Sequence, residues 1–318
     1  MDTKVTKPSI LVTYKLPSAA IAPLEAVGEV EVFRDGVLPR EELLRRVKGK
    51  QALVVAALDK VDKEVIDAGA DLKVVANVAV GYNNLDVPYA RSRGIVLTNT
   101  PDVLTEATAN MAMTLILAVT RRIVEGDRVV RRGEWKGFAL DFMIGSEVRQ
   151  HQLGIVGLGR IGQALADKAQ HFGMKITYHN PSPRAVAGYE SMSLDQLLAT
   201  SDVVSLHVPL SPQTRHLIDR AALSRMKRSA YLINTSRGAV VDEDALAWAL
   251  RESIIKGAGL DVYEDEPRIH PGLLAQENVV LVPHMASATA QTRAAMYDLV
   301  ARNVVNVLSG RPPVTPIP

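Results

Sequence analysis

The sequence predicts an α/β protein in which one doubly wound domain is inserted into another. Three observations lead to this prediction. Short apolar runs alternate with more polar helical segments, a pattern typical of buried parallel strands joined by helices. A stretch with helical periodicity and no internal proline, residues 103–132, interrupts this alternation. The chain also has 318 residues, which is enough for two domains of ordinary size.

The first set of predicted strands lies within residues 1–100. Polar segments with helical character, such as 40–48 and 63–70, separate the strands. A further helical stretch at 288–308 precedes Pro312, and we expect this helix to return to the first domain. That domain then comprises residues 1–100 and 287–318, and its predicted strands are 10–14, 30–33, 52–56, 73–78 and 95–98.

The second set of predicted strands follows residues 103–132, which we expect to form one long helix. Six strands joined by crossover helices are typical of the doubly wound sheets that bind dinucleotides. We therefore predict a Rossmann domain over residues 101–286, inserted into a flavodoxin-like domain. Its strands are expected at 152–156, 175–179, 202–206, 230–234, 257–261 and 279–282.

The composition excludes several classes of function. The 37 basic and 35 acidic residues give a net charge of +2, so neither nucleic acid nor an anionic membrane is an expected partner. Cysteine is absent, which excludes disulfides, thiolate nucleophiles and cysteine-ligated metals, and we expect no metal site. The longest apolar run, residues 111–119, covers about half of the ~20 residues that span a bilayer. With no signal-peptide pattern at its start, the protein is expected to be cytoplasmic.

A glycine-rich turn follows the strand at 152–156. Gly157, Gly159 and Gly162 form a GxGxxG motif that contains Arg160 and Ile161 and continues into a helical segment. The first glycine permits the tight turn, the second lets a pyrophosphate approach the backbone, and the third allows close packing of helix and strand. The motif in this setting predicts a dinucleotide site.

The residue expected to bind the adenosine ribose lies at the end of the next strand. Enzymes that use NAD carry Asp or Glu there, which accepts hydrogen bonds from the 2′-hydroxyl and repels a 2′-phosphate. This chain has Asn180, and Ser182 and Arg184 follow it closely. The sequence therefore predicts NADP(H) as the preferred cofactor, with NAD(H) possible.

Three later segments place polar side chains directly after predicted strands. Arg237 follows the strand at 230–234, Glu266 follows 257–261, and His284 follows 279–282. Because ligands bind at the carboxyl ends of the strands in open α/β sheets, we expect these side chains to converge on one site.

These motifs, in this order, resemble the D-isomer-specific 2-hydroxyacid dehydrogenase family over nearly the whole chain. Segments 94–101 and 104–109 resemble its glyoxylate/hydroxypyruvate reductase branch. The resemblance is carried by the segments GYNNLD (81–86), GLGRIG (157–162), LHVPL (206–210), TSRG (235–238), DVY (261–263) and HMASAT (284–289).

The resemblance implies reduction of a 2-keto acid to the D-2-hydroxy acid by hydride from NAD(P)H. Arg237 would bind the substrate carboxylate, which suits its planar guanidinium. His284 would protonate the keto oxygen, and Glu266 would favour the imidazolium that supplies the proton. Glu264 and Asp265 adjoin Glu266, but the family pattern places the carboxylate directly before proline.

The resemblance also implies binding roles for other residues. Backbone amides around Val80 and Gly81 would bind the substrate carboxylate, and Asp261 would orient the nicotinamide carboxamide. Thr105 and Thr235 are placed near the cofactor. His207 either lines the nicotinamide pocket or simply ends a strand.

The apolar stretch at residues 135–143 corresponds to a region that helps to form the dimer in this family, so we expect a homodimer; a packing loop within one chain is the alternative. Other functions remain open. Glyoxylate or hydroxypyruvate is the expected substrate, and D-3-phosphoglycerate or D-lactate dehydrogenase activity is the alternative. A different class is a non-catalytic dinucleotide-binding scaffold, as in transcriptional corepressors of this fold.

Overall fold

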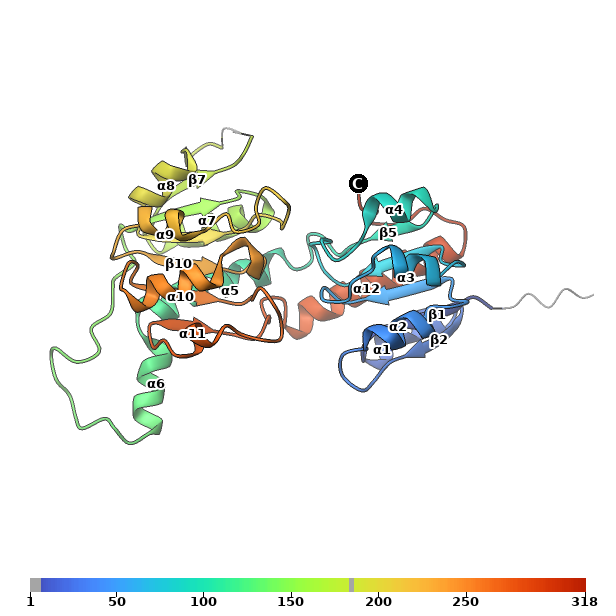
Figure 1. Ribbon diagram of the computed structural model, residues 1–318, viewed down its shortest axis with the longest axis horizontal. Helices are drawn as coiled ribbons and strands as arrows, with labels where there is room; N and C mark the ends of the chain where they lie inside the picture. The colour runs from blue at the N-terminus through green and yellow to red at the C-terminus, as the bar shows by residue number, and fades with distance from the viewer. Residues whose placement is uncertain (1–6, 183–185) are drawn as a thin grey trace, which may run out of the picture. The chain divides into compact units, whose positions relative to one another are not determined.

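The computed structural model describes residues 7–182 and 186–318, and the chain divides into two compact units. Unit 1 comprises Met1–Leu104 and Ala288–Pro318, and unit 2 comprises Thr105–Ser287. Each unit consists of a parallel sheet with helices on both faces, so the predicted α/β fold class is confirmed (Figure 1). No helix in the described ranges is both long enough and apolar enough to cross a membrane.

The described residues of unit 1 form a five-stranded sheet in the order β2-β1-β3-β4-β5, a flavodoxin-like order. Helices α1 and α12 pack together, and α2, α3 and α4 form a second group. The last residues pair with the sheet through the Ile317 N–H, which donates to Leu97. The elements are β1 (Ser9–Val12), α1 (Ser18–Glu25), β2 (Glu29–Val32), α2 (Arg40–Arg46), β3 (Ala52–Val55), α3 (Lys63–Ala68), β4 (Val74–Asn77), α4 (Val87–Ser92), β5 (Val96–Thr98) and α12 (Ala290–Leu308).

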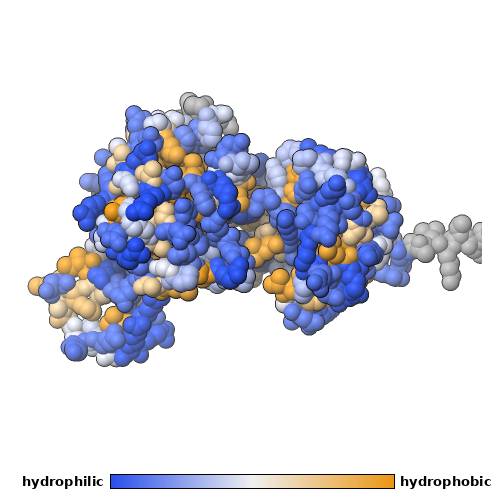
Figure 2. Space-filling view, viewed as in Figure 1, coloured by the Kyte–Doolittle hydropathy of each residue, from blue (hydrophilic) through white to orange (hydrophobic). Residues whose placement is uncertain are grey.

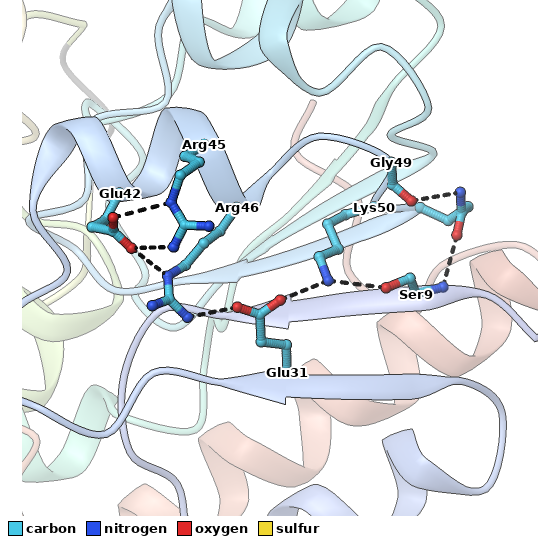
Figure 3. Close-up of polar contacts among 8 residues, drawn as sticks. Ser9, Glu31, Glu42, Arg45, Arg46, Gly49 and Lys50 are labelled. Carbon is cyan, nitrogen blue, oxygen red and sulfur yellow. Dashed lines mark hydrogen bonds and ion pairs between the residues drawn. The ribbon is translucent and has the colours of Figure 1, made fainter.

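An ion-pair network joins α2 to the edge strand β2 (Figure 3). The Glu31 carboxylate on β2 accepts from Arg46 and from Lys50, both at 2.7 Å. Arg46 also donates to Glu42 one helical turn earlier. These partly exposed ion pairs link α2 to the edge strand, and each one contributes little to the free energy of unfolding on its own.

The described residues of unit 2 form a seven-stranded parallel sheet in the order β12-β11-β10-β9-β6-β7-β8. Helix α5 packs on α7 and β11, while α8, α9, α10 and α11 pack in sequence on one another. The strands are β6 (Gln152–Val156), β7 (Lys175–His179), β8 (Glu190–Ser191), β9 (Val203–Leu206), β10 (Tyr231–Asn234), β11 (Gly257–Leu260) and β12 (Val279–Leu281). The helices are α5 (Thr105–Thr120), α6 (Ile123–Arg131), α7 (Arg160–His171), α8 (Leu194–Thr200), α9 (Arg220–Arg225), the 3₁₀ helix Gly238–Val240, α10 (Glu243–Arg251) and α11 (Pro271–Leu274).

Two expectations for unit 2 were wrong. The stretch at 103–132 is not one helix, because Arg122 adopts a left-handed conformation (φ 54°) and separates α5 from α6. Six strands were expected, whereas the described residues form seven, because the two exposed residues of β8 carry no apolar pattern that would predict a strand. The core strands β9 and β10 are buried throughout, as the apolar runs predicted.

Helix α6 and the loop after it form an arm, residues 123–147, that extends away from the sheet of unit 2 (Figure 1). None of the residues of α6 is buried. Apolar surface gathers on this arm in Figure 2. Its exposed large apolar side chains are Ile123, Val130, Trp135, Phe138, Leu140, Phe142 and Ile144.

Candidate active site

The glycine turn connects β6 to α7. Gly157 has a φ of 98°, and a Cβ there would lie 2.8 Å from the carbonyl carbon of His207. A Cβ on Gly162 would lie 2.5 Å from the oxygen of Gly157. Both glycines are therefore required by the packing of the turn. A Cβ on Gly159, which precedes α7, would meet no neighbouring atom within 4 Å in the described part of the chain, so these residues leave open space beside the helix N-terminus.

Asn180 lies directly after β7 and contacts this turn. Its Oδ1 accepts the backbone N–H of Leu158 at 2.7 Å. The side-chain oxygen is thus held by the glycine turn, and the group that remains for a ligand is the Nδ2 donor. Ser182 is exposed, whereas Arg184 lies outside the described residues.

His284 and Glu266 form a hydrogen-bonded pair after β12 and β11. His284 Nδ1 lies 2.7 Å from Glu266 Oε2, and Glu266 Oε1 accepts the Tyr263 N–H at 3.0 Å. The Glu266 side chain is 9% exposed and that of His284 is 32% exposed. Because Nδ1–H donates to the carboxylate, Nε2 is the nitrogen left to exchange a proton with a ligand.

The loop that carries His284 is held by Asp261, which follows β11. The fully buried Asp261 carboxylate accepts the backbone N–H groups of Met285 at 2.6 Å and Ala286 at 2.9 Å. Burial raises the pKa of Asp261, and the two amide donors oppose this shift. His284 itself has a φ of 49°, a left-handed conformation that is uncommon for residues other than glycine and that these bonds help to hold.

Arg237 follows β10 and is close enough to Glu266 for their charges to interact. Burial lowers the pKa of Arg237, and the negative charge of Glu266 opposes that shift. Its Nη1 donates to the carbonyl oxygen of Ser236 at 2.8 Å. The Asn234 side chain orders this turn by donating to the Arg237 carbonyl oxygen and accepting the Ser236 N–H. Unit 2 therefore brings Arg237, Glu266 and His284 together.

The other predicted residues have the following surroundings. Thr105 is the first residue of α5, and among the described residues no partner contacts the buried Thr235 hydroxyl. His207 Nε2 lies 2.9 Å from the Ser205 hydroxyl, and burial lowers the pKa of His207 to about 4, so the ring is neutral near pH 7. Val80 and Gly81 follow β4 in unit 1, where their carbonyl oxygens accept from Asn99 and Asn77.

Sequence reasoning missed several residues that order this site. The Tyr263 hydroxyl donates to the Val282 carbonyl oxygen at 2.9 Å and so ties the Glu266 loop to the end of β12. A Cβ on Gly238 would lie 1.8 Å from the Tyr263 carbonyl carbon, so only glycine fits beneath this loop. Glu243 accepts the Glu264 N–H at 2.8 Å. Tyr263 lies in the DVY motif and Gly238 in the TSRG motif, but the partners described here, Val282 for Tyr263 and Tyr263 for Gly238, are distant in sequence.

Residues 113–286 match the family model described as "D-isomer specific 2-hydroxyacid dehydrogenase, NAD binding domain". The chain belongs to the D-isomer-specific 2-hydroxyacid dehydrogenase family. A glyoxylate reductase of Thermococcus litoralis is 47% identical over 316 residues, which cover 96% of each chain. The family resemblance is therefore confirmed, and the chain carries the nicotinamide-dinucleotide-binding domain of this family.

Two solved structures are also similar. The TT0316 protein from Thermus thermophilus is 46% identical, with a TM-score of 0.93 over 98% of this chain and 100% of that chain. An NADPH-dependent glyoxylate/hydroxypyruvate reductase from Sinorhizobium meliloti, in complex with NADP and malonate, is 36% identical, with a TM-score of 0.89 over 98% of this chain and 97% of that chain.

Proposed function

We propose that this protein reduces a small 2-keto acid, glyoxylate or hydroxypyruvate, to the corresponding 2-hydroxy acid with NAD(P)H. The single observation that carries the proposal is the pair of His284 and Glu266, whose geometry leaves Nε2 as the proton donor. The glyoxylate reductases among its relatives support the choice of substrate. The family model supports the cofactor class.

The nicotinamide, when bound, supplies a hydride to the keto carbon. The remaining task is to neutralise the oxygen, which gains the electron pair of the broken C=O π bond. His284 gives the proton on Nε2 to this oxygen, and Glu266 stabilises the imidazolium before the transfer. The product is a neutral hydroxyl group, and the imidazole takes up a proton from solvent before the next turnover.

Arg237 is the proposed clamp for the substrate carboxylate. Arg237 is partly buried and close enough to Glu266 for their charges to interact, so the carboxylate binds within reach of the acid–base pair. The planar guanidinium makes strong, directional bonds to a carboxylate. The role of the backbone amides around Val80 and Gly81 as carboxylate donors stays a proposal that rests on the family resemblance, and the bonds from Asn99 and Asn77 to their carbonyl oxygens order this turn of unit 1.

We further propose NADP(H) as the preferred cofactor. Asn180 turns its oxygen to Leu158, so the amide that it offers to the ribose is a donor. A donor suits a 2′-phosphate and, unlike a carboxylate, does not repel it. Gly159, Arg160 and Ile161 would contact the pyrophosphate where α7 begins, and Ser182 and Arg184 are proposed to contact the 2′-phosphate.

Other cofactor contacts stay as proposals. The buried, unpartnered hydroxyl of Thr235 supports a ligand contact at this position within the described part of the chain. The role of Asp261 toward the nicotinamide carboxamide rests on the family resemblance; in the structure its carboxylate holds the amides of Met285 and Ala286. Thr105, at the start of α5, and the neutral His207 complete the set.

We also propose that two chains associate through the arm. Exposed apolar side chains such as Phe138 (86% exposed) and Leu140 (88% exposed) gain free energy when another surface covers them. A cavity of about 260 Å³ lies at the base of the arm and is lined in part by Val119, Val124 and Ile144. We propose that it receives apolar side chains from a second copy of this chain. Sedimentation velocity of the full chain tests this, and a monomer at micromolar concentration would contradict it.

The test of function is the loss of NADPH and NADH absorbance with a panel of keto acids. The panel contains glyoxylate, hydroxypyruvate, pyruvate, phosphohydroxypyruvate and phenylpyruvate. We expect the highest kcat/KM with glyoxylate or hydroxypyruvate and NADPH. Activity with pyruvate or phosphohydroxypyruvate alone would move the substrate to the lactate or phosphoglycerate class. Binding of dinucleotide without turnover of any acid would overturn the enzymatic proposal in favour of a scaffold.

A further inference from the structure

Glu243, the first residue of α10, is a buried acid that the proposed reaction does not use. Only 9% of the residue is exposed. Asp244, its neighbour in the same helical turn, has a side chain that is 92% exposed. A carboxylate stabilises a helix N-terminus from the solvent side as well, so the helix itself does not require Glu243 to be buried. Burying a carboxylate is costly unless hydrogen bonds compensate it.

The compensating bonds come from the loop that contains Glu266. Glu243 Oε1 accepts the Glu264 N–H at 2.8 Å. The backbone N–H and the charge of His270 also favour the ionised carboxylate, as smaller effects. Positions 264 and 270 lie on either side of Glu266, so one side chain of α10 is hydrogen-bonded to one flank of the segment that carries the proposed partner of His284 and interacts electrostatically with the other.

The peptide group between Tyr263 and Glu264 is held on two sides. Its N–H donates to Glu243, and its carbonyl carbon lies against Gly238, where no Cβ could fit. The preceding N–H, of Tyr263, donates to Glu266 Oε1 at 3.0 Å. A shift of this peptide therefore moves a direct hydrogen-bond donor of Glu266, and Glu266 in turn orients His284.

We propose that Glu243 is a positioning residue, which fixes the 263–270 loop so that Glu266 holds His284 Nδ1 and leaves Nε2 directed at the substrate. This inference rests on the proposed function for its kinetic consequence, but its structural part does not. A misplacement of about 1 Å at a reacting group costs up to roughly 100-fold in rate. The length of the Glu243 side chain places its oxygen within hydrogen-bond distance of the Glu264 N–H, and the charge of the carboxylate is secondary.

The charged groups near this contact define the alternative role. Burial raises the pKa of Glu243, the Glu264 N–H opposes the shift, and the charge of Glu264 adds to it. The Glu264 carboxylate is itself bound by Arg215 at 2.5 Å and by His216 at 2.9 Å. If Glu243 served only as a charge in this group, an aspartate would replace it and a glutamine would not.

Three variants and one control separate the effect of the length of the Glu243 side chain from the effect of its charge. Glu243→Gln keeps an oxygen at the correct distance for the Glu264 N–H, Glu243→Asp keeps the charge but is one methylene shorter, and Glu243→Ala lacks both. Asp242→Ala is the matched control. The Asp242 side chain caps α10 by accepting the Ala245 N–H, a bond within the helix itself, so its loss weakens the helix and leaves the bonds to the 263–270 loop in place.

The readouts are kcat and KM for the keto acid and the downfield proton resonance of the His284 Nδ1–H in the free protein. For Glu243→Asp and Glu243→Ala we expect kcat to fall roughly 10- to 100-fold with little change in KM, and the resonance to weaken. Glu243→Gln is expected to keep kcat and the intensity of the resonance close to the wild-type values. Asp242→Ala is expected to lower the melting temperature without these changes.

Several results would overturn the proposal. Wild-type kinetics in Glu243→Asp together with a loss in Glu243→Gln would assign the effect to charge. The same kcat loss in Asp242→Ala would assign it to helix stability. If Glu243→Ala does not fold, the Gln and Asp variants decide. If the wild type itself reduces no keto acid, the proposed function fails, and the His284 resonance still tests the positioning role.

Discussion

Replacing Glu266 with glutamine removes the charge from the acid–base pair while preserving its shape. The carboxylate accepts two donors, His284 Nδ1–H at 2.7 Å and Tyr263 N–H at 3.0 Å, one on each oxygen. Glutamine has one oxygen and one NH₂ group. If its oxygen stays with Tyr263, its NH₂ group faces His284 and the bond that orients the imidazole is lost.

The structure sets the size of the expected effect. The Glu266 side chain is 9% exposed, so solvent screens the interaction only weakly. A hydrogen bond to a charged group contributes about 1.5–3 kcal/mol, and tenfold in rate corresponds to about 1.4 kcal/mol. We therefore expect Glu266→Gln to lower kcat/KM for keto-acid reduction roughly 10- to 150-fold near neutral pH.

The assay is the initial rate of NADPH oxidation at saturating cofactor near neutral pH, over a range of keto-acid concentrations. Glu264→Gln is the matched control, because Glu264 is a neighbouring glutamate whose carboxylate contacts Arg215 and His216 and not His284. An unchanged kcat/KM in Glu266→Gln, or an equal loss in Glu264→Gln, would refute the assignment of Glu266 as the partner of His284.

Four other predictions concern separate parts of the molecule. His284→Gln is expected to lower kcat about 100- to 10,000-fold with an unchanged Kd for NADPH in a fluorescence titration; equal turnover would remove His284 as the acid. Asn180→Asp keeps an acceptor for the glycine turn and is expected to shift the ratio of kcat/KM for NADPH and NADH about tenfold or more toward NADH; a fixed ratio would exclude Asn180 as the selective residue. The folded-state pKa of His207, about 4, lies below the ordinary 6.5, so between pH 6.5 and pH 4 the unfolded chain binds a proton at this residue that the folded chain does not. The contribution of the neutral ring to the free energy of unfolding is complete above pH 6.5 and is lost as pH falls to 4. In urea unfolding the wild type should lose up to about 3 kcal/mol more than His207→Gln over that range; parallel losses would contradict this. Phe138→Glu places a charge on the exposed apolar arm and is expected to give monomers in sedimentation velocity, whereas Val37→Glu, at an exposed apolar residue of unit 1, should not; an unchanged dimer in Phe138→Glu would show that Phe138 is not at the interface.

The strands and turns whose formation depends on their own residues could be predicted from the sequence. Apolar runs such as 203–206 are strands because they are buried on both faces of a parallel sheet. The turn at Gly157 has a positive φ that glycine adopts without strain. Local patterns failed where the cause lies elsewhere. Periodicity continues through Arg122, yet the chain turns there, and nothing in the composition of residues 190–191 marks the edge strand β8.

The candidate site illustrates the same division. The order of the motifs and their positions after strands placed Arg237, Glu266 and His284 at one edge of the sheet, because parallel strands all end at the same edge. Their assignment to the reaction stays a prediction. The sequence also suggested that Asn180 faces the ribose, but did not indicate that its oxygen would be bound by Leu158.

The sequence by itself determined the family, the α/β class and which residue types lie at strand ends. The tertiary structure decided which hydrogen-bond partners hold those residues. Asp261 binds amides 24 and 25 positions away, and Glu243 binds one 21 positions away. A sequence pattern records the chemical type of a side chain, whereas a hydrogen bond depends on distance and direction. Those quantities exist only after β10, β11 and β12 have been aligned in one sheet.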